Sequence, residues 1–320
     1  MNNMSNHVKQ IRTIFVLTTA IILCSLIAIW INHTYFHYPG VSYFPDNASK
    51  LLMNLLLFYC ASHIYFGPKS KTSKIMVHII AYYCFLATLA LLTTAAQYTP
   101  FRTIDNTINT LENLIPIKLL TIIAWTNHHS VLYNLLGNMY VSLNLEMIFV
   151  PLFLIITWKR GHLYEYFTLM LTSALIGFVF YYFFPSSGPA SVLKSDYFSV
   201  SQLATGQKFS DLHHYITPKT IEGGLIGIPS FHTIWAWLSV YAIRSFRALY
   251  YVLLPYNVMI ILACVMLGWH FYTDILGGFF VLILSHGFCV MQRTTSKWSE
   301  SGTEDHAGIE QVSISNNAIL

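Results

Sequence analysis

A short stretch near the middle of the second half of the chain combines groups that can hold and protonate a phosphate. The residues 222–237 read EGGLIGIPSFHTIWAW, and Pro229 suits the first turn of a helix, where a missing N–H has no cost. The N–H groups of Ser230, Phe231 and His232 would then be free and, with the positive end of the helix dipole, form an anion site. The hydroxyl and the imidazole add a hydrogen-bond donor and a group that exchanges protons near neutral pH. Taken alone, the stretch also fits a capped helix with an interfacial histidine.

A second stretch, residues 268–278, reads GWHFYTDILGG and carries a histidine and an aspartate four residues apart. Residues at this spacing share one face of a helix, so the carboxylate of Asp274 is expected to bond one ring nitrogen of His270. That bond would fix the tautomer and make the other nitrogen the better nucleophile. A pair that only closes a loop is the alternative, but ionisable groups inside an apolar run are functional as a rule.

The composition places both stretches in a membrane. Of the 320 residues, 55% are hydrophobic and 9% charged, whereas soluble domains carry about 25% charged residues. The net charge of +4 comes without a basic stripe, which argues against nucleic acid as a partner. The five cysteines lie in apolar runs without CxxC spacing, and adjacent histidine pairs such as His128–His129 point apart, so no metal or cofactor is expected.

The hydrophobic pattern predicts an all-α fold, a polytopic membrane helix bundle. Because a spanning helix needs roughly 20 apolar residues, we expect about eight transmembrane helices, at 13–32, 50–67, 75–98, 137–158, 163–184, 230–248, 250–268 and 272–291. Segment 103–136 starts polar and contains Pro116 and Lys118, which favours an interfacial helix.

The same pattern suggests three parts. Residues 1–136 would hold the N-terminal transmembrane helices and the interfacial segment, and residues 137–291 the catalytic helix bundle. Residues 292–320, rich in Ser, Glu and Asn, would form a disordered cytoplasmic tail.

The distribution of Lys and Arg predicts the orientation. With eight spans and the N-terminus inside, short inner loops and tails receive most of the basic residues, as the positive-inside rule expects. The 185–229 loop and the 268–272 turn then both open on the periplasmic or lumenal side. The pattern does not indicate an oligomeric state.

The motifs GIPSFHT and GWHFYTDILGG resemble the second and third signatures of the type 2 phosphatidic acid phosphatase superfamily, most closely in the branch of inositol phosphorylceramide synthases. The resemblance implies that His270 attacks phosphorus to form a phosphohistidine and that Asp274 orients it. It also implies that His232 protonates the leaving oxygen while Ser230 and nearby amides, including that of Phe231, hold phosphate oxygens. Members of this superfamily need no metal.

The departures from the family pattern concern cations. The region that resembles the first signature, YYFFPSSGPASVLK, keeps Gly188 but has no Arg, and Lys194 is its nearest cation. Cys264 stands where the third signature usually has an Arg. Fewer cations weaken the recognition of a dianionic terminal phosphate most, which favours a phosphodiester substrate. Two other lysines of the outer loop, Lys208 and Lys219, are candidates to replace the missing charge.

Glu146 is an acid inside a predicted span, and such groups face the bundle interior. One interpretation is that it orients His232 or takes a proton from an acceptor alcohol. The other is that it is protonated and only bonds a neighbouring helix.

These features predict an integral membrane enzyme that acts on the phosphate of a lipid headgroup. If water is the acceptor, the enzyme is a phosphatase; if an alcohol is the acceptor, it makes a new phosphodiester, and the low cation count slightly favours the second. A lipid or polyprenyl phosphate phosphatase is the alternative enzyme. A transporter or scaffold in which the two histidines relay protons is the alternative of another class.

Overall fold

The computed structural model describes residues 2–222 and 224–292, so the predicted C-terminal tail lies outside the described residues apart from Gln292. The described residues form helices and no strand, which confirms the all-α prediction. The elements are α1 (Asn2–Ile31), η1 (Asn32–Phe36), α2 (Ala48–Phe66), α3 (Lys71–Ala96), α4 (Asp105–Glu112), α5 (Leu119–His128), α6 (Ser130–Ile156), α7 (Arg160–Phe183), η2 (Pro189–Ser191), α8 (Val200–His213), α9 (Phe231–Ala242) and α10 (Arg247–Met266). The helix Tyr272–Gln292 follows and is called the last helix below.

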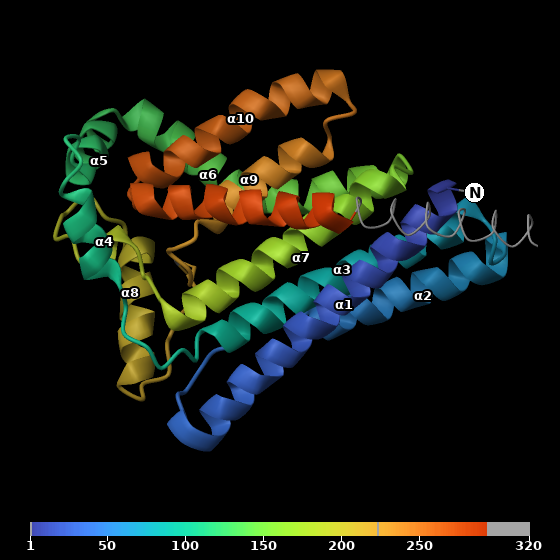
Figure 1. Cartoon of the computed structure of the whole chain (residues 1–320), viewed down its shortest axis with the longest axis horizontal. Coiled ribbons are helices and arrows are strands. Elements are labelled where there is room, and N and C mark those ends of the chain that lie inside the picture. Colours follow the sequence, from blue (N-terminus) through green and yellow to red (C-terminus); the bar gives the residue numbers. More distant parts are fainter. Residues whose placement is uncertain (1, 223, 293–320) are drawn as a thin grey trace, which may run out of the picture.

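The long helices form two groups that meet at α7 (Figure 1). Helices α1, α2 and α3 pack together and α1 and α3 contact α7. Helices α6, α9 and α10 pack together, and α6 and α9 contact the other side of α7. The short helices α4, α5 and α8 gather at one end of the molecule, at the left of Figure 1, and cover the loops that connect the long helices there.

Helix α7 forms the core because it is apolar on every side. Its consecutive residues Leu169, Met170 and Leu171 are all fully buried, which a helix achieves only when it is surrounded. At the end opposite α8, Glu165 of α7 accepts hydrogen bonds from Tyr241 and Arg244, which lie at the end of α9. This contact fixes the far end of α9 to the core.

Six described helices are long and apolar enough to cross a membrane, rather than the eight predicted. Two predicted spans are absent from that set. Helix α2 forms as expected but carries Lys50, Asn54 and His63 among its 19 residues. Helix α9 has only 12 residues, about 18 Å at 1.5 Å per residue, because it begins after the cap Ser230 and ends at Ala242.

The segment predicted to be one interfacial helix is divided. It contains α4 and α5, and the turn at His129 separates α5 from α6. Helix α6 begins at Ser130, so residues 130–136 belong to a long apolar helix and the prediction for them is wrong. The apolar run after His129 continues without a break into the predicted span, which explains the longer helix.

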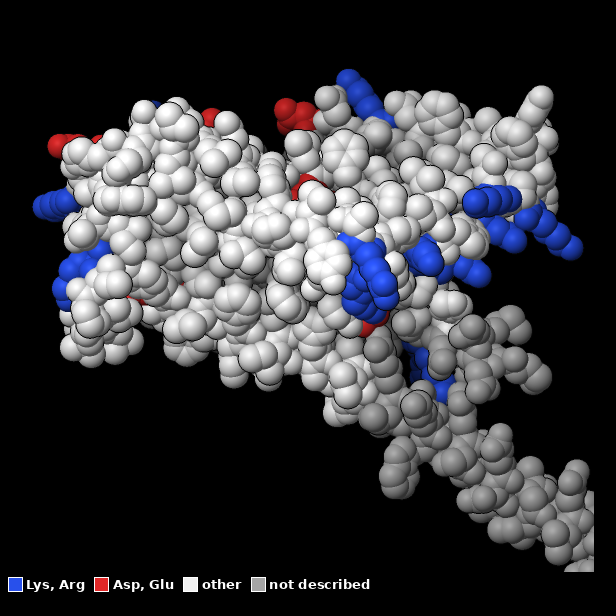
Figure 2. Space-filling model, turned by 90° about the horizontal axis from the view of Figure 1, so that it is seen from above, with Lys and Arg blue, Asp and Glu red and all other residues white. Residues whose placement is uncertain are grey.

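Basic residues concentrate in the turns at the end of the bundle opposite α8. These turns carry Lys69, Lys71, Lys74, Lys159, Arg160, Arg244 and Arg247. Figure 2 shows a broad region without Lys or Arg on one face between the basic residues at the two ends. A belt with so few charged groups is what a bilayer requires of a surface that contacts its hydrocarbon.

Candidate active site

The loop before the last helix holds His270 against Asp274. The Nδ1 atom of His270 lies 3.2 Å from Oδ2 of Asp274, and both side chains are buried. With Nδ1–H donating to the carboxylate, Nε2 is the ring nitrogen that carries a free lone pair. The arrangement is that of an oriented nucleophile or base.

This pairing arises from helix capping and not from a shared helical face. His270 lies in the turn before the last helix, which starts at Tyr272, whereas Asp274 lies in its first turn. Oδ2 of Asp274 also accepts the N–H of Phe271 at 3.0 Å, the backward half of a capping box. The backbone N–H of His270 donates to the carbonyl of Cys264 at 2.9 Å, which ties the turn to the end of α10.

His232, in the first turn of α9, lies next to His270. The two ring centroids are 5.9 Å apart and the ring planes differ by 57°. Tyr140 of α6 stacks on His232 with centroids 4.0 Å apart, and it also stacks on Trp269 at 5.2 Å. Stacking on Tyr140 therefore positions both the imidazole of His232 and the residue that precedes His270.

Ser230 is the N-cap of α9 and not a free donor at its mouth. Its hydroxyl accepts the N–H of Thr233 at 3.3 Å, and its own N–H donates to the carbonyl of Asp274 at 3.0 Å. The prediction that the N–H of Ser230 is free is therefore wrong. The N–H groups of Phe231 and His232 form no hydrogen bond with the described residues, so two amides remain at this helix end.

Glycines let the last helix approach this cap closely. A Cβ atom on Gly278 would lie 2.9 Å from the carbonyl oxygen of Ser230 and 3.0 Å from Cβ of Thr233. A Cβ atom on Gly277 would lie 3.1 Å from Ile228. Gly277 and Gly278 thus permit close packing near the site, and the contact brings the two histidine-bearing segments together.

Asp105, which was not among the predicted site residues, begins α4 and binds the loop that resembles the first signature. Its buried carboxylate accepts the hydroxyls of Ser186 and Ser187 at 2.6 and 3.2 Å and the N–H groups of Ser187 and Gly188 at 3.0 Å. Gly188, predicted to bind substrate, thus gives its N–H to this carboxylate. It has φ +88°, and an added Cβ would lie 3.1 Å from the carbonyl of Trp269.

Glu112, at the other end of α4, acts on the last helix. Its Oε1 atom accepts the N–H and the hydroxyl of Thr273 at 2.7 and 3.0 Å. Burial raises the pKa of Glu112, and these hydrogen bonds lower it in part. Helix α4 therefore holds both the 186–188 loop and the turn that carries His270. The signal in the sequence was the pair of acids, seven residues apart, in the otherwise polar start of segment 103–136.

The lysines proposed to replace the missing family cations occupy different environments. Lys194 and Lys219 are exposed, and neither forms a hydrogen bond or ion pair with the described residues. Lys208 of α8 is buried and donates to the carbonyls of Ile221, Glu222 and Gly224. The structure therefore gives Lys208 a structural role, and the prediction that it binds phosphate finds no support.

Helix α8 itself lies in what the sequence suggested was a loop. It starts with a capping box between Ser199 and Gln202, a pattern readable in the sequence as S-x-x-Q. The side chain of Gln202 then donates to the carbonyl of Leu267 at 2.8 Å, three residues before His270. The outer loop is thus fixed to the end of α10 beside the site.

Glu146 lies on α6 away from the histidines. Its Oε1 atom accepts Nδ2 of Asn257 in α10 at 3.2 Å, and no contact joins it to His232 among the described residues. The prediction that it orients His232 finds no support in this geometry. Within residues 2–222 and 224–292, no three His, Cys, Asp or Glu side chains gather as a metal ligand set.

The comparison with family models gives one match. The model described as PAP2 superfamily matches residues 106–288, which is more than half of the chain. The chain belongs to the PAP2 superfamily. The match begins in α4 and ends in the last helix, so it includes every element that holds the two histidines. Comparisons with curated proteins and with solved structures found no match.

Membership of the PAP2 superfamily indicates a phosphatase or phosphotransferase. In this PAP2 protein, the chemical groups that such a reaction needs lie within one small region. An oriented imidazole, a second imidazole and two unpaired helix amides converge between α9 and the last helix. The site lies toward the end of the bundle that carries α4, α5 and α8 (Figure 1).

Proposed function

We propose that this protein transfers the phosphate-containing group of a membrane lipid through a phosphohistidine at His270. The observation that carries the proposal is the 3.2 Å contact between Nδ1 of His270 and Asp274, with His232 adjacent at a centroid distance of 5.9 Å. One imidazole is fixed for attack, and the other is within reach of the oxygen that leaves.

The reaction takes two balanced steps. Nε2 of His270 attacks phosphorus, the bond from phosphorus to the leaving oxygen breaks, and His232 gives its proton to that oxygen. An acceptor O–H then gives its proton to His232 and attacks phosphorus, which breaks the P–N bond and restores His270. The amides of Phe231 and His232 at the start of α9 support the negative charge of the phosphate oxygens.

The charge around the site supports one kind of substrate over another. Lys208 is committed to backbone carbonyls, and Cys264 takes the position of a family Arg. With fewer cations, a singly charged phosphodiester is bound more easily than a dianionic phosphate. We therefore favour transfer to a lipid alcohol, as in inositol phosphorylceramide synthases, over hydrolysis of a lipid or polyprenyl phosphate.

The side of the membrane follows from the charge at the two ends. The turns opposite the site hold seven Lys and Arg residues in short connections. Under the positive-inside rule that end is expected to be cytoplasmic, which supports a site on the periplasmic or lumenal side. Labelling of single cysteines introduced at Lys69 and Lys194 with a membrane-impermeant maleimide tests this topology, and reaction at Lys69 alone in intact cells would contradict it.

A direct test uses purified protein in detergent with phospholipid donors and lipid alcohol acceptors. Headgroup release or a new phosphodiester, blocked by vanadate and retained in EDTA, is expected. His270→Ala and His232→Ala should each remove nearly all turnover while the fold is kept, and the exposed His214→Ala is the matched control. Ordinary turnover in His270→Ala would exclude the covalent mechanism, and ion or lipid transport without chemistry would favour a transporter.

A further inference from the structure

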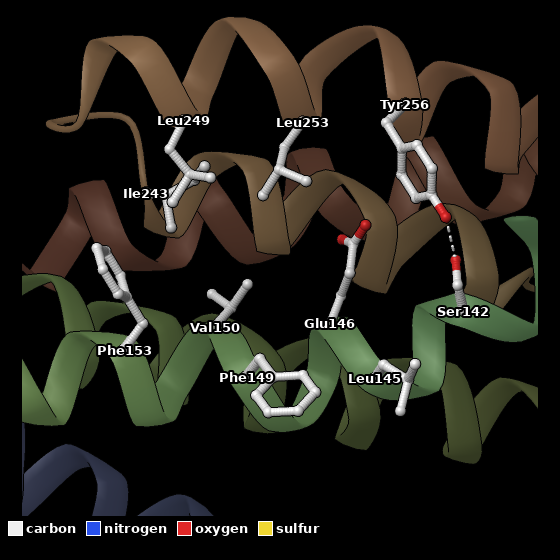
Figure 3. Close-up of a pocket in the computed structure, with 10 residues that line it drawn as sticks. All are labelled: Ser142, Leu145, Glu146, Phe149, Val150, Phe153, Ile243, Leu249, Leu253 and Tyr256. Atoms are coloured by element: carbon white, nitrogen blue, oxygen red, sulfur yellow. Dashed lines mark hydrogen bonds between the residues drawn. The ribbon is translucent and has the colours of Figure 1, made fainter.

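A groove between α6 and α10 is separate from the histidine site. It encloses about 390 Å³, within the range of about 300–1,000 Å³ that ligand pockets occupy. Seven of its ten lining residues are Leu, Ile, Val or Phe. Figure 3 shows Val150 and Phe153 of α6 opposite Leu249 and Leu253 of α10. Leu145 and Phe149 lie on the outer side of α6, and Ile243 lies at the end of the groove opposite Ser142.

Glu146 is the only charged residue that lines this groove in the described part of the chain, and its side chain extends from α6 toward α10 (Figure 3). Asn257 donates to Oε1, but Oε2 is buried and has no hydrogen-bond partner among the residues that the structure describes. Glu146 is only 8% exposed, so water compensates little for the missing hydrogen bond. A buried polar atom without a partner is unfavourable, and an occupant that pairs with it is stabilised.

The groove faces the lipid. Both α6 and α10 are candidate spans. Leu145 and Phe149, which form its edge, are exposed by 55% and 63% on the surface of the bundle. The surrounding medium of such a surface is the acyl chains of the bilayer, so an apolar chain is the occupant that this lining fits.

We propose that this groove binds a membrane lipid through its alkyl chain and through a hydroxyl or amide group that pairs with Oε2 of Glu146. Hydroxyl and amide groups both donate and accept, so they satisfy this oxygen whether or not the carboxyl group is protonated. A lipid whose polar groups are all esters has acceptors only, so it cannot pair with Oε2 unless that oxygen carries a proton. The groove therefore selects for hydroxyl- or amide-bearing lipids.

The spacing along α6 sets the position of the lipid. Ser142, which bonds Tyr256 at 2.6 Å, closes one end of the groove. Glu146 lies four residues further, about 6 Å along the helix, and Phe153 lies eleven residues beyond Ser142, about 16 Å. The polar group of the lipid would thus lie near one end, and its chain would fill the remainder.

The polar end of the groove is the end near the histidines. Tyr140, which stacks on His232, precedes Ser142 by two residues on α6. A lipid in the groove directs its head toward the candidate active site, as an acceptor alcohol must. This last step rests on the proposed function, whereas binding in the groove does not.

Binding can be measured without turnover. The probes are a fluorescent long-chain N-acylethanolamine, which has one amide and one hydroxyl, and the methyl ester of the same fluorescent fatty acid. Purified full-length protein in detergent should bind the first about 3- to 10-fold more tightly, the value of one buried hydrogen bond. Glu146→Leu should remove this difference, and Leu253→Trp, which fills the groove, should weaken both probes.

Val252→Trp is the matched control, because Val252 adjoins Leu253 on α10 but does not line the groove and is 66% exposed. It should bind both probes like the wild type. The proposal would be overturned if the wild type bound the two probes equally. It would also be overturned if Glu146→Leu and Leu253→Trp both bound the probes as the wild type does. His270→Ala should bind both probes normally, so a failure of the proposed chemistry and a failure of the groove give different results.

Discussion

The ring of Tyr140 lies parallel to the ring of His232, with centroids 4.0 Å apart and an interplanar angle of 11°. Tyr140 stacks in the same way on Trp269, so α6 supplies one surface against which both histidine-bearing segments are placed. The stack restrains the imidazole in the orientation that faces His270. A residue outside both histidine signatures thus positions His232, the proposed proton donor.

Replacement of Tyr140 tests this positioning role. Tyr140→Leu should lower kcat about 10- to 100-fold with a smaller effect on KM, because a misplaced proton donor slows chemistry more than binding. Tyr140→Phe keeps the stacked ring and should restore kcat. Equal activity in all three proteins would show that the stack has no positioning role.

Asp274→Asn tests the orientation of the nucleophile. The amide keeps the shape of the side chain but does not stabilise Nδ1–H of His270 as a carboxylate does, so turnover should fall about 10²- to 10⁴-fold. Acid-labile phosphate on the protein, trapped during turnover, should fall in parallel. Full labelling with full turnover would contradict the assignment.

Asp105→Asn tests the carboxylate in the 186–188 loop. The side chain of Asn has one acceptor oxygen for these donors, whereas the carboxylate has two. The free energy of unfolding should therefore fall by about 1.5–3 kcal/mol, the usual contribution of hydrogen bonds to a charged group. The melting temperature in detergent measures the effect. Asn106→Ala, at the exposed neighbouring position, is the control and should melt with the wild type. If both variants melt alike, the carboxylate does not stabilise the loop.

Gly278→Ala tests the close contact of the last helix with Ser230, and Gly287→Ala in the same helix is the control. Gly278→Ala places a methyl group 2.9 Å from a carbonyl oxygen and should destabilise by about 1–3 kcal/mol. Nothing lies within 4 Å of a Cβ on Gly287, so Gly287→Ala should stabilise by about 0.5–1 kcal/mol through helix propensity. Thermal unfolding of the two variants should shift in opposite directions, and shifts of the same sign would contradict the packing.

The buried amine of Lys208 should make the stability of the protein depend on pH. Burial lowers the pKa of Lys208 to about 8, whereas the unfolded chain keeps the ordinary value of 10.5. Between these values the unfolded state binds more protons, so the contribution of Lys208 to stability rises with pH from about 8 to 10.5. Melting curves at several pH values should show this rise in the wild type and not in Lys208→Met. A parallel pH dependence in both proteins would contradict it.

The fold class and the facing histidines could be predicted because they depend on local signals. Apolar runs of about 20 residues specify the long helices, and an acid at the start of a helix specifies the turn that holds His270. The span predicted at 230–248 was too long because it included Arg244 and Arg247, whereas α9 ends before them at Ala242. Arg244 follows this end and pairs with Glu165, which lies far away in the sequence.

The buried carboxylates could not be placed for a similar reason. Asp105 and Glu112 read as polar residues of an exposed short helix, and only the folded chain shows that they accept backbone N–H groups more than 80 residues away. Lys208 looked like a candidate phosphate ligand, because a lysine in an outer loop gives no sign that carbonyls of its own loop surround it. Hydrophobic periodicity carries no information on such long-range polar pairs.

The carboxylate of Asp105 affects how much the 186–188 loop must change when a substrate binds. Amides and hydroxyls that converge in a tight loop need a negative partner, and here the chain contains its own. The loop is therefore already ordered before a substrate binds, and binding needs no free energy to order it. If the reaction takes place at the two imidazoles as proposed, selectivity depends on their surroundings, since this loop is the same for every substrate.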